Sequence, residues 1–398
     1  MGEWSRYSGP KVLSSRSFTA LPAAILGLPL LPVIDFIYFD AGGGHRAAAI
    51  ALKSVIESEK RPWQIRLVNL QEVLDSLDIF RKLTGIRLED IYNRMLGKGW
   101  TLGAAPGLKF MHAVIRAYHR PVVRLLEEHW AKTKPDMVVS LVPNLNRALF
   151  ESLRKALPSV PYFTILTDFA DYPPHFWIEQ QEQYFICGTD RAVEQARALG
   201  HPDSRIFRAS GMILRPAFYE PVTIDRGTER RRLGLDPSRP IGLVLFGGQG
   251  SKVMIEIAKR LGDAQLILIC GRNQKLAEEL RAIKTAAPRF IEGFTSEIPY
   301  YMSLADFFVG KPGPGSISEA VAMKLPVIVE RNTWTLPQER YNADWVREQE
   351  VGLVLPNFRG VDDAVRTLLG DLHRYRERVS KIENRAVFEI PEILATRI

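Results

Sequence analysis

The chain has almost no cysteine: Cys187 and Cys270 are the two cysteines among its 398 residues. Each closes an apolar run, so we expect two buried free thiols rather than a disulfide or a metal site. The HExxH pattern, paired CxxC motifs and acidic metal clusters are also missing from the sequence. These absences exclude the common metal-site motifs, and two free thiols suit a reducing, cytoplasmic compartment.

Long apolar runs are missing as well. No stretch of about 18 consecutive apolar residues occurs, so we expect no ordinary transmembrane helix. The segment Leu21–Pro32, with Arg6, Lys11 and Arg16 before it, has the outline of a signal peptide, but three prolines interrupt it and no small-residue cleavage site follows. We treat residues 1–32 as an N-terminal extension, either a shallow membrane-contacting arm or a non-native extension from an upstream start codon.

The overall composition is that of a folded protein with a basic surplus. Hydrophobic residues make up 46% and charged residues 25% of the chain, and the net charge is +8. The length predicts two domains of roughly 200 residues each. The charge favours anionic partners, but helix-turn-helix, RNA-recognition and zinc-finger signatures are absent and the basic residues are scattered. We therefore expect no nucleic acid among the partners.

Short apolar runs alternate with longer amphipathic segments, which is typical of strands and helices around parallel sheets. We expect strands over residues 33–39, 65–69, 137–141, 162–166, 184–187 and 206–209, and then over 241–246, 265–269, 290–292, 307–309, 327–329 and 352–354. The predicted fold class is α/β, with two Rossmann-like doubly wound domains. A cleft between them would lie at the carboxyl ends of both sheets, where such folds bind ligands.

The domain boundaries follow from this alternation. We expect one domain over residues 33–215, a proline-containing linker over 216–240, a second domain over 241–370, and a C-terminal helix and tail over 371–398. Helical spacing ends near Ala386, so the last residues are predicted to be a short tail.

An insertion from Asp78 to Arg120 interleaves basic with apolar and aromatic residues. Such a pattern favours contact with an anionic membrane surface. A packed pair of helices with a solvated face is an equally good interpretation. The basic residues concerned are Lys82, Arg87, Arg94, Lys98, Lys109 and Arg116.

Three glycine-rich turns each follow an expected strand and precede an expected helix. They are Gly42–Gly44, the FGGQGS turn that contains Gly248 and Gln249, and KPGPGSISEA from Lys311 to Ala320. In the last of these, Gly313 and Gly315 would let backbone amides approach a phosphate at a helix start. Three such units in one chain favour a nucleotide-handling enzyme. The alternative is that Ser316 and Glu319, three residues apart, form a capping box that only ends the helix.

His45 is the residue best placed for proton transfer. It directly follows Gly43 and Gly44, where a helix begins, and an imidazole there could accept a proton from a hydroxyl group. The alternative is a surface histidine that caps the helix. Asp168 and Asp171 are spaced like a two-carboxylate metal motif but are interpreted as loop caps or acceptor contacts.

Together these motifs resemble the monogalactosyldiacylglycerol synthase family, whose bacterial relatives include processive diacylglycerol glucosyltransferases. The resemblance spans roughly residues 33–370 and rests on AGGGHRAAA at 41–49, CGRNQKL at 270–276, GF at 293–294, KPGPGSISEAVAMKLPVIV at 311–329 and PQERYN at 337–342. The peptidoglycan N-acetylglucosaminyltransferase that acts on lipid I is similar at the same places, as a more distant relative.

The resemblance implies a GT-B fold and an inverting transfer of galactose or glucose from a UDP-sugar to a lipid acceptor, with diacylglycerol expected. The second domain would hold the donor, the first the acceptor, and no metal or other cofactor would be essential. By position, His45 would be the base and Glu319 would bind the ribose. Further donor contacts would come from Gly248, Gln249, Arg272, Phe294, Gly313, Gly315, Ser316, Gln338, Glu339 and Asn342, and Gly43 and Gly44 would form a phosphate or acceptor turn.

The resemblance also implies a cytoplasmic enzyme that associates peripherally with an anionic membrane surface. Gln249 stands where the family pattern has an acidic residue, and the loop 331–336 carries a bulky Trp334, which leaves the donor sugar open. Alternative functions are N-acetylglucosaminyl transfer to a polyprenyl-linked acceptor, UDP-sugar 2-epimerisation and a catalytically inert nucleotide-binding protein.

Overall fold

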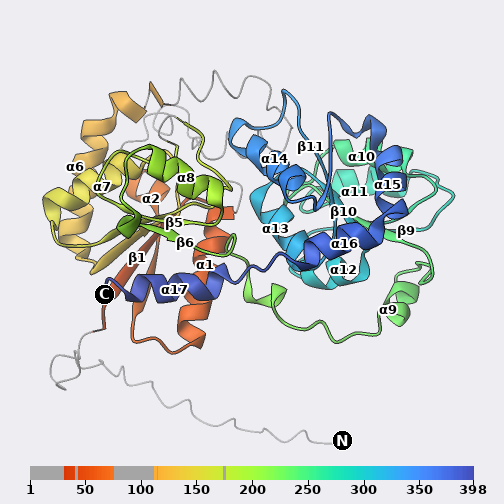
Figure 1. Cartoon of the computed structure of the whole chain (residues 1–398), viewed down its shortest axis with the longest axis horizontal. Coiled ribbons are helices and arrows are strands. Elements are labelled where there is room, and N and C mark those ends of the chain that lie inside the picture. Colours follow the sequence, from red (N-terminus) through yellow and green to blue (C-terminus); the bar gives the residue numbers. More distant parts are fainter. Residues whose placement is uncertain (1–30, 41–43, 76–111, 114, 174–175) are drawn as a thin grey trace, which may run out of the picture. The chain divides into compact units, whose positions relative to one another are not determined.

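The computed structural model describes residues 31–40, 44–75, 112–113, 115–173 and 176–398, and residues 32–398 form one compact unit. It contains two six-stranded sheets in which every neighbouring pair of strands is parallel (Figure 1). We call the first sheet and the helices packed on it the first lobe, and the second sheet with its helices the second lobe.

The first sheet has the strand order β2-β1-β3-β4-β5-β6. Its strands are β1 (Val33–Tyr38), β2 (Gln64–Asn69), β3 (Met137–Ser140), β4 (Tyr162–Ile165), β5 (Tyr184–Cys187) and β6 (Ile206–Arg208). The second sheet has the order β12-β11-β10-β7-β8-β9. Its strands are β7 (Ile241–Leu245), β8 (Gln265–Ile269), β9 (Arg289–Glu292), β10 (Phe307–Gly310), β11 (Val327–Glu330) and β12 (Gly352–Leu355).

All twelve predicted strands are confirmed, each with ends within one residue of the prediction. The central strands are buried along their whole length, since helices cover both faces of a parallel sheet and leave no polar face. In each sheet the strand order reverses beside the first strand of the lobe, which is where open α/β sheets form their binding crevice.

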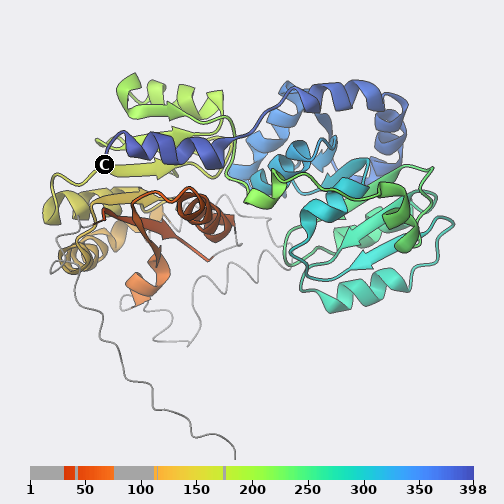
Figure 2. The ribbon, with the colours of Figure 1, turned by 90° about the horizontal axis from the view of Figure 1, so that it is seen from below.

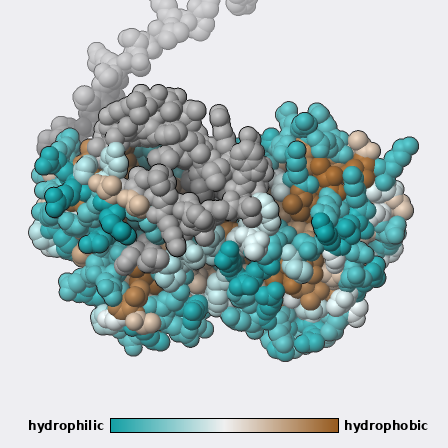
Figure 3. Space-filling model, turned by 90° about the horizontal axis from the view of Figure 1, so that it is seen from above, coloured by the Kyte–Doolittle hydropathy of each residue, from teal (hydrophilic) through white to brown (hydrophobic). Residues whose placement is uncertain are grey.

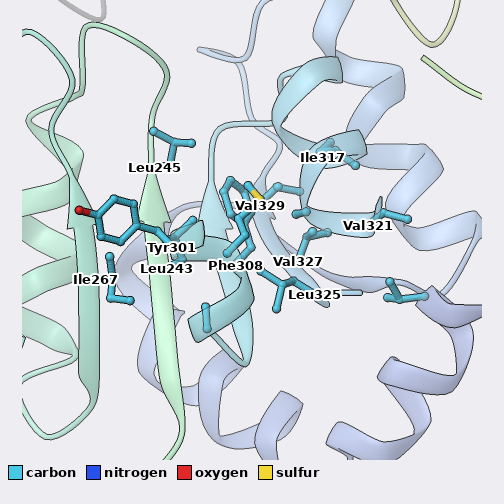
Figure 4. Close-up of a cluster of buried hydrophobic side chains, with 14 of the residues drawn as sticks. Leu243, Leu245, Ile267, Tyr301, Phe308, Ile317, Val321, Leu325, Val327 and Val329 are labelled. Atoms are coloured by element: carbon cyan, nitrogen blue, oxygen red, sulfur yellow. The ribbon is translucent and has the colours of Figure 1, made fainter. Parts of the chain in front are cut away.

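Helices follow most strands. In the first lobe they are α1 (Gly44–Ser58), α2 (Leu70–Leu74), α6 (His119–Thr133), α7 (Asn146–Ala156) and α8 (Asp190–Ala198). In the second lobe they are α9 (Arg226–Arg232), α10 (Val253–Arg260), α11 (Gln274–Arg281), α12 (Ile298–Leu304), α13 (Pro314–Ala322), α14 (Arg340–Glu348), α15 (Val361–Gly370) and α16 (Leu372–Ser380). Figure 4 shows Ile317 and Val321 of α13 facing the buried side chains of β10 and β11, which fixes the helix on the sheet.

Residues 216–240, expected as a linker, contribute to the second lobe. Phe218, Leu233 and Leu235 belong to its buried core. Arg230 of α9 is also buried, and its Nη2 lies 2.7 Å from Oδ2 of Asp306 at the start of β10. The segment is therefore tied to the lobe by both apolar and ionic contacts.

The predicted C-terminal tail is wrong, because the last residues form another helix, α17 (Ala386–Ala395). The chain leaves the second lobe after α16 and returns to the first, where α17 lies beside α1 (Figures 1 and 2). Ala386, Val387, Ile390 and Leu394 are buried in one cluster with β1 and α1. The last helix thus completes the core of the first lobe.

On the face shown in Figure 3 the described side chains are mainly hydrophilic, and apolar ones gather in small patches. Among the described residues, none of the helices combines the length and the hydropathy needed to cross a bilayer. Cys187 and Cys270 are both buried free thiols, as predicted. Most of the insertion over residues 78–120 lies outside the described residues.

Candidate active site

The turn between β10 and α13, residues 311–315, is built as the sequence predicts for an anion site. Gly313 is the N-cap of α13, Pro314 follows as the first helical residue, and no side chain caps the helix. The free amides of a helix start carry partial positive charge, so an anion can bind there directly. We call residues 311–315 the donor turn.

The capping-box alternative for this turn is contradicted. A capping box needs the hydroxyl residue at the N-cap, but Gly313 occupies that position and Ser316 lies within the first turn of the helix. Ser316 is half-buried, and Gly315 is exposed with open space at the position of an added Cβ.

Glu319 lies one turn further along α13 and is half-buried. Among the described residues its carboxylate has no hydrogen-bond or ion-pair partner. Burial raises its pKa to about 7, against the charge of Arg215, which lowers it. A carboxylate without a partner at this depth is suited to accept two hydroxyl hydrogen bonds.

Lys311 and Glu339 form an ion pair across the donor turn, with 2.9 Å between Lys311 Nζ and Glu339 Oε1. Asn342, fully buried at the start of α14, donates from Nδ2 to the carbonyl oxygen of Pro312 over 2.9 Å, while its Oδ1 is buried without a partner. A Cβ at Gly313 would lie 3.2 Å from Lys311 Cε, so glycine leaves room for the lysine stem. These contacts hold the turn in shape.

Gln338 is half-buried in the short 3-10 helix Pro337–Glu339. The structure thus brings Glu339 and Asn342 to the donor turn, and Gln338 is the neighbour of Glu339 in the chain. It also gives Glu339 a partner, Lys311, that the sequence analysis did not assign.

A second glycine turn, residues 247–250, follows β7 and packs on the turn after β8. Arg272 donates its backbone N–H to the carbonyl oxygen of Gly248 over 2.9 Å. Gly271 has a φ of +59°, and a Cβ there would lie 2.3 Å from that same oxygen, so no other residue fits. Gly248 and Gln249 are consequently held at an exposed tip.

Arg272 and Phe294 form an exposed pair beside this tip. The guanidinium carbon of Arg272 lies 4.6 Å from the centroid of the Phe294 ring, and that ring is 61% exposed. An exposed aromatic face with a cation on it offers a stacking surface for a planar base.

His45 is the second residue of α1, at the end of the first strand's turn. The imidazole is half-buried, packs edge-on against the indole of Trp177 with 6.0 Å between ring centroids, and has a buried Nδ1 with no partner among the described residues. Burial lowers its pKa to about 4. The alternative of an exposed capping histidine is contradicted. Gly44 begins the helix, and Gly43 lies outside the described residues.

Asp168 and Asp171 both bind Trp177, as loop caps would. The indole Nε1 donates to Asp168 Oδ2 over 2.9 Å, and the backbone N–H of Trp177 donates to Asp171 Oδ1 over 2.7 Å. Among the described residues no group of three or more histidines, cysteines or carboxylates could hold a metal ion. The sequence analysis missed Trp177, because no spacing signal links it to His45.

The carboxylate of Asp168 interacts both with Trp177, which packs against His45, and with the charged residues at the donor turn. Burial raises the pKa of Asp168 to about 7, the hydrogen bond from Trp177 lowers it, and the charges of Glu339 and Lys311 act on it from the second lobe. Phe169, the next residue, belongs to the buried core of the second lobe. Asp168 therefore links the Trp177 indole beside His45 with the charges of the donor turn.

Two doubly wound lobes, each built on a parallel six-stranded sheet, are the architecture of a GT-B fold. Among solved structures, MurG of Acinetobacter baumannii matches with a TM-score of 0.58 and 12% identity, covering 92% of this chain and 99% of its own. A UDP-GlcNAc 2-epimerase of Neisseria meningitidis bound to UDP-GlcNAc matches with a TM-score of 0.56 and 15% identity, covering 92% and 100%. At these identities the likeness shows the fold alone.

In sequence the chain is homologous to monogalactosyldiacylglycerol synthases. The protein of Glycine max named "Probable monogalactosyldiacylglycerol synthase, chloroplastic" is 29% identical over 328 residues, which are 79% of this chain and 60% of that protein. The chloroplastic synthase of Spinacia oleracea is 28% identical over 351 residues, 83% of this chain and 65% of its own. The chain thus spans less than two thirds of the length of these relatives. No protein-family model matches it.

Proposed function

We propose that this protein is an inverting glycosyltransferase that transfers galactose or glucose from a UDP-sugar to a lipid acceptor, diacylglycerol. The proposal depends on the contacts of Asp168. Its carboxylate binds the Trp177 indole, against which the half-buried His45 packs, and the charges of Lys311 and Glu339 beside the uncapped start of α13 act on it. The homology to synthases of a galactolipid supports the lipid acceptor and the hexose donor.

The donor would lie along the carboxyl edge of the second sheet. Its diphosphate would meet the amides at the start of α13 and the ammonium of Lys311, and its ribose hydroxyls would donate to Glu319. The uracil ring of the donor would stack near Phe294 and Arg272. Gln338, Glu339 and Asn342 would then face the sugar, since they border the same turn.

In the reaction, the acceptor hydroxyl oxygen forms a bond to the anomeric carbon while the bond from that carbon to the diphosphate oxygen breaks. The hydroxyl proton passes to the imidazole of His45, and UDP leaves with the electron pair from the face opposite the attack. The transition state resembles an oxocarbenium ion, so the helix-start amides and Lys311 stabilise the growing negative charge on UDP. The proposal includes no metal or other cofactor.

We further propose that the enzyme works at a membrane surface as a peripheral protein, because its acceptor is a lipid and its net charge of +8 favours an anionic bilayer. The interleaved basic and apolar residues of the insertion after Asp78 are consistent with such contact.

A vesicle assay tests the proposal. Purified protein is incubated with radiolabelled UDP-galactose, UDP-glucose or UDP-N-acetylglucosamine and vesicles with and without diacylglycerol. We expect label in lipid with one of the two hexose donors, and only when diacylglycerol is present. Label that remains in free sugar nucleotide as an epimer would instead indicate a 2-epimerase. In a parallel incubation with vesicles that contain a polyprenyl-linked acceptor, transfer of N-acetylglucosamine alone would indicate the lipid I type of enzyme.

A further inference from the structure

The loop that follows β4, residues 166–173, contacts both lobes. Phe169 lies in the buried core of the second lobe, where its ring meets Trp345 of α14 edge-on with 4.8 Å between centroids. Asp168, one residue earlier, binds Trp177 of the first lobe. Asp168 and Phe169, which are neighbours in the chain, thus contact different lobes.

Trp177 is fixed at each of its polar atoms. Its indole N–H donates to Asp168, its backbone N–H donates to Asp171, and its carbonyl oxygen accepts from Asn146 Nδ2 over 3.2 Å. The side chain is fully buried. The imidazole of His45 packs against this indole in a T-shaped arrangement. Because the indole is held firmly, it limits where the imidazole can lie.

Charges face Asp168 from several elements. Lys311 and Glu339 act on it from the second lobe and Asp171 from its own loop, while the imidazole of His45 packs against the indole that Asp168 binds. Burial places the pKa of Asp168 at about 7, so small changes in these charges alter its ionisation near neutral pH.

We propose that Asp168 is a positioning residue that couples His45 to the donor turn: through the indole of Trp177 it holds the imidazole in place, and through the Lys311–Glu339 pair it responds to the bound donor. Asp168 does not touch the reacting atoms. The inference rests on the proposed function, because it takes the diphosphate of a UDP-sugar to bind at the donor turn.

The coupling has a measurable consequence. A diphosphate at the donor turn adds negative charge near Asp168 and draws Lys311 toward itself, and both effects disfavour the ionised carboxylate. Donor binding should therefore raise the pKa of Asp168 and protonate it. If its pKa rises by about one from a value near 7, the carboxyl takes up about half a proton at pH 7.5.

The test is calorimetry of UDP-sugar binding in buffers of different ionisation enthalpy, which yields the number of protons exchanged. UDP-sugar is the probe because its diphosphate does not titrate near pH 7. The wild type should take up about half a proton more than Asp168→Asn, which keeps a hydrogen-bond acceptor for the indole but cannot ionise. Groups on which Asp168 does not act, such as Glu319, should exchange the same number of protons in both proteins and cancel in the difference.

Glu179→Gln is the matched control. Glu179 is a buried carboxyl on the segment that follows Trp177, and burial also raises its pKa to about 7, but the charges that act on it are those of Arg147, Asp171 and His119. Its loss should leave the proton exchange as in the wild type. Equal exchange in wild type and Asp168→Asn would overturn the coupling. Absence of any UDP-sugar binding to the wild type would overturn the proposed function, and this inference with it.

The positioning role is tested by turnover. Trp177→Phe keeps a ring against His45 but removes the N–H, and Asp168→Ala removes its acceptor. Each should lower kcat about tenfold with KM for UDP-sugar changed less than about twofold, because the lost hydrogen bond orients the base rather than the donor. The double variant should also be about tenfold slower, since both changes break one interaction. A hundredfold loss would mean independent effects and contradict the link.

Discussion

At the scale of single residues, burial lowers the pKa of one candidate site residue, His45, and raises the pKa of another, Glu319. Desolvation disfavours the charged form of each group. It lowers the pKa of His45 to about 4, so the imidazole is neutral and able to accept a proton at neutral pH. It raises the pKa of Glu319 to about 7, so that carboxyl is only partly ionised under the same conditions.

His45→Ala should lower turnover by about 10²–10⁴ and leave UDP-sugar affinity nearly unchanged, because the base acts on the acceptor and not on the donor. In the wild type, kcat should fall only as pH drops toward about 4, where the imidazole becomes protonated. The vesicle assay over a pH series measures both effects. His373→Ala is the control, since His373 is exposed on α16. Unchanged turnover in the purified His45→Ala protein would remove His45 from the mechanism.

Glu319→Gln should weaken UDP-sugar binding by about tenfold, because an amide accepts hydroxyl hydrogen bonds less strongly than a carboxylate. The wild type should also bind more weakly as pH falls through about 7, where Glu319 gains a proton, and the variant should lose this part of the pH dependence. Titration calorimetry at several pH values measures both. An isotherm like that of the wild type would show that Glu319 does not contact the donor.

The residues that the sequence alone could predict are those whose amino-acid type is restricted by backbone geometry. Gly313 at a helix start is such a residue, whereas His45 is recognisable because an imidazole that can accept a proton follows a glycine run. The Lys311–Glu339 pair could not be predicted, because it joins residues 28 apart that meet only after the lobe has folded. The same is true of Trp177, whose partners come from the loop after β4, from α1 and from α7.

At the scale of elements, the strands were predictable and one helix was not. Each central strand is an apolar run buried on both sides, so its sequence is nearly sufficient to define it. α17 was missed because Pro391 interrupts it, and proline inside a helix removes a hydrogen bond. Burial of Ile390, Pro391 and Leu394 against the first lobe offsets that loss.

Asp306 is the element-scale feature with the largest expected effect on stability. It directly precedes β10, accepts from the backbone N–H of Ile241 in β7, and pairs with Arg226 and Arg230 of α9 and Arg376 of α16. Burial opposes its ionisation, but the amide and the guanidinium groups outweigh burial and lower its pKa. Its ionised form therefore stabilises the fold above its ordinary pKa, and this contribution is lost as pH falls through the lowered value.

Asp306→Asn should lower the free energy of unfolding by about 3–5 kcal/mol, because it leaves the buried Arg230 without its counter-charge. Denaturant unfolding measures the change. Glu256→Gln, which removes an exposed pair with Arg260 on α10, should cost no more than about 0.5 kcal/mol. A similar small loss for both variants would mean that the Asp306 cluster is not a stabilising junction.

At the scale of the whole molecule, the chain crosses between lobes twice. The outward crossing passes Ser210, Gly211 and Met212, and the return passes Asn384, whose Nδ2 donates to the carbonyl oxygen of Met212 over 2.9 Å. A Cβ at Gly211 would lie 2.6 Å from the Asn384 side chain, so the two crossings lie in close contact.

Leu394→Ala should destabilise the first lobe by about 2–5 kcal/mol, since Leu394 is fully buried in the cluster that joins α17 to α1 and β1. Thermal unfolding followed by tryptophan fluorescence measures the loss. Glu392→Ala, on the exposed side of α17 and paired with Arg61, should change stability by no more than about 1 kcal/mol. If both variants melt alike, α17 is not part of the first lobe's core.

The return of α17 also sets the order in which the protein can fold during translation. The first lobe is synthesised early, but its last helix ends at Ala395 and leaves the ribosome after every strand of the second lobe. We therefore expect the core of the first lobe to be completed only after the second lobe has been synthesised, so that the usual order, in which the domain made first matures first, does not apply to this protein.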